Sequence, residues 1–353
     1  MINSSLGETF KTSSNNFNLI RLLAALSVIY GHATAITGKG PADIFVQLVG
    51  FKFIGGVAVD VFFIISGFLI TASALGSQGL KYYIVSRVLR IYPALIVCVV
   101  FTVFVVGLIF TTADNYLTAK QTWSYLWVNA STYNTEYFLP GVFETLHDKA
   151  VNGSLWSLAV EVRLYLIIFV LAVVGGLSRR SVFNVLFFCV LIAGFLNKEF
   201  WSFLFEYENH RHVALMFMMG SFAWVNRDLI SLNPWILLAL LFLAATTHGT
   251  PSFGLMYNLL LPYLVLYVAF APGAKWFNRF GDYSYGVYLY GWLSQQLVMS
   301  FMPVADNFQN TILSCLLAFF FAVVSWHFVE KPTIKLKEYF KRDVARVGRT
   351  EYV

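Results

Sequence analysis

Charged residues are scarce in this sequence. Only 12% of its 353 residues are Asp, Glu, Lys or Arg, and 58% are hydrophobic, whereas a soluble domain carries about 25% charged residues. This shortage excludes an ordinary soluble protein and predicts a polytopic membrane protein. Cysteine is scarce as well. The three cysteines all fall inside apolar runs, which argues against a disulfide framework or a cysteine-rich metal site.

The apolar residues gather in segments of the length that a hydrocarbon core of about 30 Å requires of an α-helix. The sequence therefore predicts an all-α fold: an integral membrane bundle of about ten transmembrane helices, with no cleaved signal peptide. The expected spans are 17–37, 55–74, 91–110, 154–176, 181–197, 212–226, 233–248, 254–271, 283–302 and 311–330. The expected divisions are an N-terminal segment (1–16), a transmembrane domain (17–330) with a long outside loop (111–153), and a basic tail (331–353).

Lys and Arg are distributed unevenly between the two sides of this predicted bundle. With the N-terminus inside, the inside segments and the tail hold sixteen of them and the outside segments hold six; Arg21 and Arg163 lie within spans. The positive-inside rule then predicts that both termini are cytoplasmic. We expect a multi-pass protein of the cytoplasmic, or inner, membrane. The basic tail is accordingly interpreted as a topology and lipid-headgroup feature, and not as a nucleic-acid site.

Several ionisable residues interrupt the spans, where polar groups are costly and usually functional. Arg21 and His32 lie about 16 Å apart along the first span. Counting from span ends puts His32, Asp60 and Glu161 at a similar depth, so we expect them to share an interior site, because isolated buried charges are unfavourable. Structural alternatives are a carbonyl-bonded His32, a helix-terminal Asp60, and a Glu161–Arg163 pair, although residues two apart face different ways.

Other motifs suggest ligand contacts. Arg87 and Arg90 are three residues apart and share one helix face near the inner surface, which suits a polyphosphate or serves as a plain membrane anchor. Ser66 and Gly67 are small, so a slender ligand or a neighbouring helix can approach them. The loop 111–153 is rich in Tyr, Trp, Asn and Thr, a composition suited to sugar contacts or to the headgroup boundary.

These segments, in this order, resemble the acyltransferase family 3 membrane proteins, which include bacterial O-acetyltransferases of lipopolysaccharide O-antigen and of Nod factor. The resemblance covers nearly the whole chain. Its motifs are Arg21-x10-His32, "FFIISGFLIT", Arg87-x-x-Arg90 followed by Ile91 and Pro93, "SLWSLAVEVRLYL", "SYGVYLYGWLSQQ" and "SWHFVEKP". Two departures concern the acceptor: Val162 stands where many members carry a second acid, and Tyr290-Gly291 replaces a histidine-containing pattern.

The resemblance implies a membrane O-acyltransferase, with acetyl as the expected group. It would move that group from cytoplasmic acetyl-CoA to a hydroxyl of a cell-surface polysaccharide or lipid-linked glycan outside. Acetyl-CoA would be a substrate, and we expect no tightly bound cofactor and no metal. The expected partners are acetyl-CoA, the glycan and membrane lipids, without nucleic acid. The competing class is a proton-coupled transporter, because intramembrane charges mark such carriers too.

The resemblance also implies roles for the polar residues. His32 would be the general base or a transient acyl carrier, and Glu161 would orient its imidazole. Arg21, Arg87 and Arg90 would hold the CoA phosphates, and the pantetheine arm would pass Ser66. Asp60 and Arg163 would be supporting residues.

Overall fold

The computed structural model describes residues 5–12, 15–41, 43–202 and 204–341. In this part the chain is helical and contains no β-strand, apart from one isolated bridge between Ser5 and Ser231. The long helices are α2 (Phe17–Thr37), α4 (Ile54–Ala74), α5 (Gly79–Phe101), α8 (Trp156–Val173), α9 (Arg180–Leu196), α10 (Glu208–Val225), α11 (Pro234–Thr247), α12 (Phe253–Phe270), α13 (Ser284–Phe301) and α14 (Asn307–Ser325).

Shorter elements connect or extend the long helices. The short α-helices are α1 (Leu6–Thr12), α3 (Ile44–Val49), α6 (Leu108–Phe110), α7 (Lys120–Ser131) and α15 (Lys331–Lys335). The 3-10 segments are η2 (Gly153–Leu155), η3 (Lys198–Trp201), η4 (Ala274–Phe280) and η6 (Leu336–Phe340), and the π-helical segments are η1 (Thr102–Gly107) and η5 (Trp326–Glu330). The expected outside loop 111–153 thus contains a helix, α7.

Each predicted span coincides with a long helix, although the helix expected at 91–110 begins twelve residues earlier, at Gly79. Among the described residues, six helical segments are long and apolar enough to cross a membrane: Phe17–Thr37, Ile54–Ala74, Gly79–Phe110, Gly153–Val173, Phe253–Phe270 and Asn307–Phe340. Helices α9 and α11 are apolar but shorter. The protein is therefore an all-helical, multi-pass membrane protein, while the number ten and the cytoplasmic side stay predictions.

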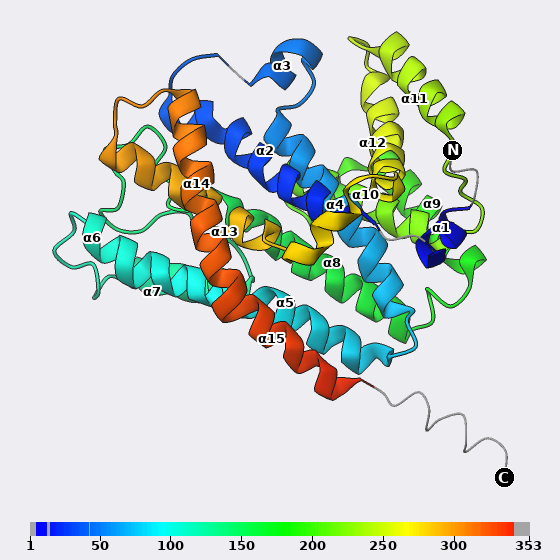
Figure 1. Ribbon diagram of the computed structural model, residues 1–353, viewed down its shortest axis with the longest axis horizontal. Coiled ribbons are helices and arrows are strands. Elements are labelled where there is room, and N and C mark those ends of the chain that lie inside the picture. Colours follow the sequence, from blue (N-terminus) through cyan, green and yellow to red (C-terminus); the bar gives the residue numbers. More distant parts are fainter. Residues whose placement is uncertain (1–4, 13–14, 42, 203, 342–353) are drawn as a thin grey trace.

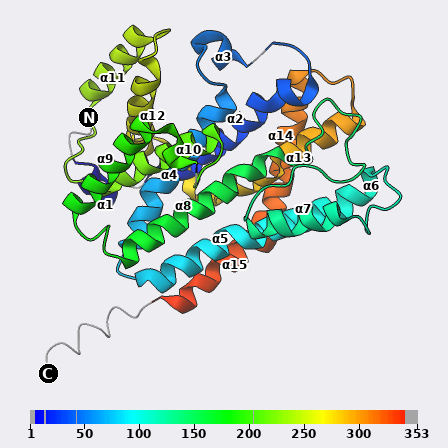
Figure 2. The same cartoon turned by 180° about the vertical axis from the view of Figure 1, so that it is seen from behind.

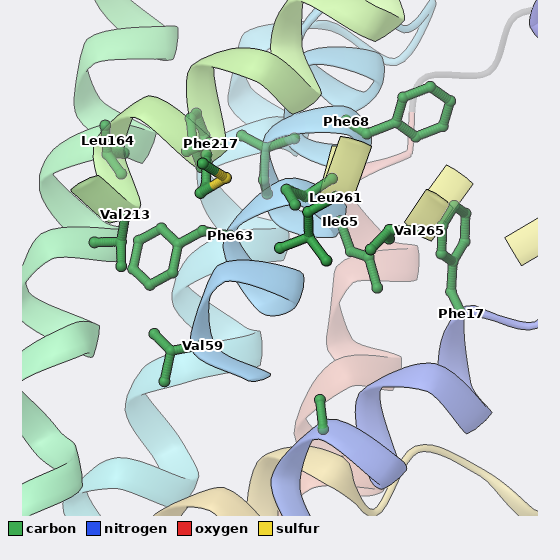
Figure 3. Close-up of a cluster of buried hydrophobic side chains, with 14 of the residues drawn as sticks. Phe17, Val59, Phe63, Ile65, Phe68, Leu164, Val213, Phe217, Leu261 and Val265 are labelled. Atoms are coloured by element: carbon green, nitrogen blue, oxygen red, sulfur yellow. The ribbon is translucent and has the colours of Figure 1, made fainter. Parts of the chain in front are cut away.

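Helix α4 lies at the centre of the bundle (Figures 1 and 2), and it packs most extensively on α10. Two glycines permit this contact: a Cβ on Gly67 would meet the Phe217 carbonyl oxygen, and one on Gly220 would meet that of Ile64. Figure 3 shows the apolar core around α4, with residues from α2, α4, α8, α10 and α12: Phe17, Val59, Phe63, Ile65, Phe68, Leu164, Val213, Phe217, Leu261 and Val265.

The C-terminal helix does not stop where the tail was expected. Helix α14 continues through the π-helical turn η5 into α15 and η6, and α15 lies alongside α5 (Figures 1 and 2). Residues 331–340 are therefore helical and lie alongside α5. A π-helical turn adds a residue to the α-helical repeat, and in η5 the side chain of Glu330 is buried.

The two ends of the bundle gather different segments. At one end, which we call the arginine end, Asn16 donates to the carbonyls of Val268 and Ala271, and Arg90 pairs with Asp282. At the opposite end, the histidine end, Thr37 donates to Asn307, close to the residues that follow His32. This grouping agrees with the alternation of sides in the predicted topology.

Candidate active site: a cavity between the arginines and the glutamate

A cavity of about 350 Å³ lies among α2, α4, α5, α8, α13 and the C-terminal segment. Five residues that the sequence singled out, from four motifs, line it: Arg21, Ser66, Arg87, Arg90 and Glu161. The cavity thus combines cations toward the arginine end with a carboxylate and a hydroxyl deeper in the bundle. Further polar residues in its wall, which the sequence did not single out, are Ser86, Ser157, Tyr165, Asp282, Ser284, Tyr285, Tyr288 and Lys337.

The arginines of the cavity are not equivalent. The Arg90 guanidinium lies 2.6 Å from Asp282 and 3.2 Å from Glu330, and Arg21 lies 3.5 Å from the same oxygen of Asp282. Burial opposes the ionisation of the Asp282 carboxyl, but Arg90 and Arg21 still hold its pKa below the usual value. Arg21 and Arg90 are therefore partly neutralised within the protein.

Arg87 is the cation of this group that keeps its charge available. It lies three residues before Arg90 and forms no ion pair within the part of the chain that the structure describes; its Nε donates to Ser86 at 3.4 Å. Lys337, on η6, lines the same cavity. The sequence could have indicated Lys337, because positions 330, 334 and 337 lie on one face if the last helix continues. The segment after 330 was instead assigned to the tail.

Glu161 faces the cavity through a small hydrogen-bonded group. Its Oε1 accepts from Ser66 at 2.9 Å and from the Tyr165 hydroxyl, and these two hydroxyls lie 3.0 Å apart. Arg163 lies on another face, as the spacing predicts, and donates to backbone carbonyls of Tyr133 and Leu204. The alternative of a Glu161–Arg163 pair is therefore wrong.

His32 lies outside this cavity. Its Nδ1 is 2.8 Å from the Val28 carbonyl oxygen, so Nδ1 donates a hydrogen bond, and in the neutral ring Nε2 presents a lone pair. Its ring makes edge contacts with Phe53 and Trp292 and lies beside Gly55. Gly55 and Ser66 are separated by eleven residues of α4, or about 16 Å. The expectations that His32 and Glu161 share one site, and that Glu161 orients the imidazole, are therefore wrong.

Asp60 occupies a third location. Its Oδ2 is 2.6 Å from the Lys52 ammonium, 2.6 Å from the Tyr257 hydroxyl and 3.1 Å from Nε2 of His212. The carboxylate is fully buried. Burial lowers the pKa of Lys52, an effect that the nearby Asp60 opposes. Asp60 thus joins α4 to α10 and α12 and touches neither His32 nor Glu161.

A few side chains separate His32 from the end of the cavity that points toward the histidine end of the bundle. At this end Ser157 and Tyr288 form a hydrogen bond of 2.6 Å, and the Tyr288 ring contacts Phe62 with 5.5 Å between centroids. One turn further along α13, or about 6 Å, the Trp292 ring lies 5.0 Å from the His32 ring. The cavity therefore extends most of the way from the arginine end toward the histidine.

The fold and the cavity define a multi-pass helical membrane protein with a polar site inside the bundle. The chain belongs to acyltransferase family 3, because the acyltransferase domain of that family matches residues 14–328. It is 28% identical to an O-acetyl transferase of Shigella phage Sf6, over 90% of this chain and 95% of that protein. It is 25% identical to Nodulation protein 10 of Rhizobium leguminosarum bv. viciae, over 92% and 94%.

An uncharacterized protein of Haemophilus influenzae is 29% identical over 41% of this chain and 62% of that protein. No solved structure matches the chain. The protein is therefore an acyltransferase, which favours an enzyme over the proton-coupled transporter considered above.

Proposed function

We propose that the protein transfers an acetyl group from cytoplasmic acetyl-CoA to a hydroxyl of a surface polysaccharide or lipid-linked glycan on the outer side of the inner membrane. The observation that carries the donor assignment is the cavity, whose lining includes two cations without ion pairs in the described chain, Arg87 and Lys337. The name of the phage relative supports acetyl as the transferred group.

In this proposal the cavity binds the donor. Arg87 offers a planar fork to phosphate oxygens and Lys337 adds a point charge. The pantetheine arm lies against α4 and passes Ser66 and Glu161. Arg21 and Arg90 form part of the cavity wall through their ion pairs with Asp282. They add a positive field that is weaker than that of Arg87 and Lys337. The thioester then reaches the layer formed by Ser157 and Tyr288, one turn from the residues that contact His32.

His32 supplies the acid–base chemistry in this proposal. Its Nε2 lone pair accepts the proton of the acceptor hydroxyl, and the hydroxyl oxygen attacks the thioester carbonyl carbon. The new C–O bond forms, the C–S bond breaks, and the CoA thiolate leaves and takes up a proton. The bond from Nδ1 to Val28 holds the ring in the tautomer that this step requires. In the variant route, Nε2 first carries the acetyl group and then passes it to the hydroxyl.

The donor site is tested by titrating acetyl-CoA against purified protein in lipid nanodiscs and measuring CoA release. Arg87→Ala and Lys337→Ala should each raise the KM for acetyl-CoA about tenfold or more, because a charge-assisted hydrogen bond contributes about 1.5–3 kcal/mol. Arg180→Ala is the matched control, because Arg180 is exposed on α9 and outside the cavity. A KM equal to that of the control in both variants would overturn the donor assignment.

A further inference from the structure

A second cavity, of about 320 Å³, lies away from the donor cavity, and no step proposed above uses it. We call it the aromatic cleft. It is built where the segment after α7 meets the first turns of α8 and α10. Its lining consists of Asn134, Thr135 and Tyr137 from that segment, Trp156 from α8, Tyr207 just before α10, and Asn209 and His210 from α10.

Flat rings form one wall of the aromatic cleft. The Trp156 and His210 rings are stacked at 5.1 Å with an angle of 7° between their planes, and Tyr207 meets His210 edge-on at 5.0 Å. Tyr207 is 57% exposed, so its ring is accessible from outside. Such a wall offers an apolar face to a ring-shaped ligand that has apolar C–H groups on one side.

The polar groups of the cleft lack protein partners. Within the described chain, the exposed side chains of Asn134 and Asn209 and the half-buried one of Thr135 form no hydrogen bond, whereas Nδ1 of His210 is the buried atom without a partner. A buried polar atom without a partner costs about 1–3 kcal/mol. A ligand with several hydroxyl groups would replace water on the two amides and on the Thr135 hydroxyl, because hydroxyls both donate and accept.

The charges around the cleft favour a neutral ligand. No Lys, Arg, Asp or Glu is part of its described lining, and Arg163 nearby donates to backbone carbonyls. Burial and, secondarily, Arg163 lower the pKa of His210, which lies outside the six candidate spans, to about 4. The imidazole is therefore uncharged near neutral pH. A phosphate or carboxylate would find no counter-charge in this lining.

The cleft adjoins the region of His32. Tyr137 packs against the apolar cluster that contains Ile36 and Trp292, its carbonyl accepts from the backbone of Val151, and the Trp292 ring lies 5.0 Å from His32. The aromatic cleft is thus on the histidine side of the bundle, away from Arg87 and Lys337. A ligand held here would approach the imidazole from the end opposite to the donor.

We propose that the aromatic cleft binds a neutral sugar residue of the acceptor glycan and so positions a hydroxyl of the chain toward His32. Trp156 and Tyr207 contact the C–H face of the sugar ring, and Asn134, Asn209 and His210 hydrogen-bond its hydroxyls. This inference rests on the proposed function for the identity of the acceptor, but it assigns residues that the donor cavity does not contain.

The test uses oligosaccharides released from the surface polysaccharide of cells that lack the gene. Binding to the full-length protein in nanodiscs is measured by saturation-transfer NMR, and transfer is measured by mass spectrometry. Tyr207→Ala and Asn209→Ala should each raise the oligosaccharide Kd about tenfold, equivalent to about 1.4 kcal/mol, and leave CoA release without acceptor unchanged. Tyr133→Ala is the matched control, because Tyr133 is 78% exposed on the same segment but outside the cleft lining.

The outcomes separate the cleft from the reaction. If the wild type acetylates the oligosaccharide while the cleft variants bind it as the Tyr133→Ala control does, the cleft assignment is overturned and the proposed function stands. If the oligosaccharide binds and the cleft variants weaken it, but no acetyl group is transferred, the cleft stands and the proposed function fails. Absence of binding to the wild type overturns the cleft assignment.

Discussion

Removing the guanidinium of Arg90 should destabilise the bundle, whereas removing that of Arg87 should not. Arg90→Ala leaves Glu330, only 1% exposed, without the cation that lies 3.2 Å away. Leaving a buried charge without its partner costs about 3–5 kcal/mol. We expect a loss near 3 kcal/mol, because Asp282 keeps Arg21 at 3.5 Å. Arg87 has no ion pair in the described chain, so its removal should change stability by less than about 0.5 kcal/mol.

The measurement is the unfolding midpoint of purified protein in one detergent, for the wild type, both single variants and Arg90→Met combined with Glu330→Gln. The double variant replaces the ion pair with neutral side chains of similar volume, which is often close to neutral in stability. It should therefore be more stable than Arg90→Ala. Equal midpoints for the two single variants, or a double variant no more stable than Arg90→Ala, would refute the distinction between the arginines.

Two further changes test the catalytic residues and the packing of the core. His32→Ala should lower the rate of transfer by about 10²–10⁴-fold and leave the affinity for acetyl-CoA unchanged. In the double variant with Glu161→Gln, the two fold-losses in rate should multiply, because the two side chains contact different residues. A double variant no slower than the slower single variant would contradict the separation of the two residues. Gly67→Ala forces a Cβ against the Phe217 carbonyl and should lower the yield of monodisperse protein in size-exclusion chromatography. Gly254→Ala is the control and should not lower this yield, because its Cβ would meet its nearest neighbour at an ordinary 3.6 Å. Equal yields would show that α4 and α10 tolerate wider spacing.

The helices were predictable because the length of apolar runs is a local property. The first span even has the predicted bounds, since Gly38, in the left-handed conformation with φ of 66°, ends α2 after Thr37. Spacing also placed Arg87 and Arg90 on one face. It did not reveal the partners of Arg90, because Asp282 and Glu330 lie 192 and 240 residues further along the chain.

The shared site of His32, Asp60 and Glu161 was predicted wrongly for two physical reasons. Counting residues assumes that helices begin in one plane. Segment η2 begins at Gly153 against Trp292, which is at the level of His32, so Glu161 lies about 12 Å deeper. Counting also ignores direction around a helix. Asp60 faces α10 and α12, and its partner Lys52 belongs to a connecting segment that the prediction treated only as a marker of topology.

The π-helical turn η5 makes the cationic lining of the donor cavity depend on the phase of one helix. If the same residues continued instead as a regular α-helix of 3.6 residues per turn, the extra residue held in this turn would rotate every later side chain by up to about 100° around the helix axis. Glu330 would then leave Arg90, and Lys337 would point away from Arg87, although the hydropathy profile would hardly change. Two homologues with indistinguishable membrane spans can therefore differ in how they hold an anionic donor through the winding of one turn near the end of the last span.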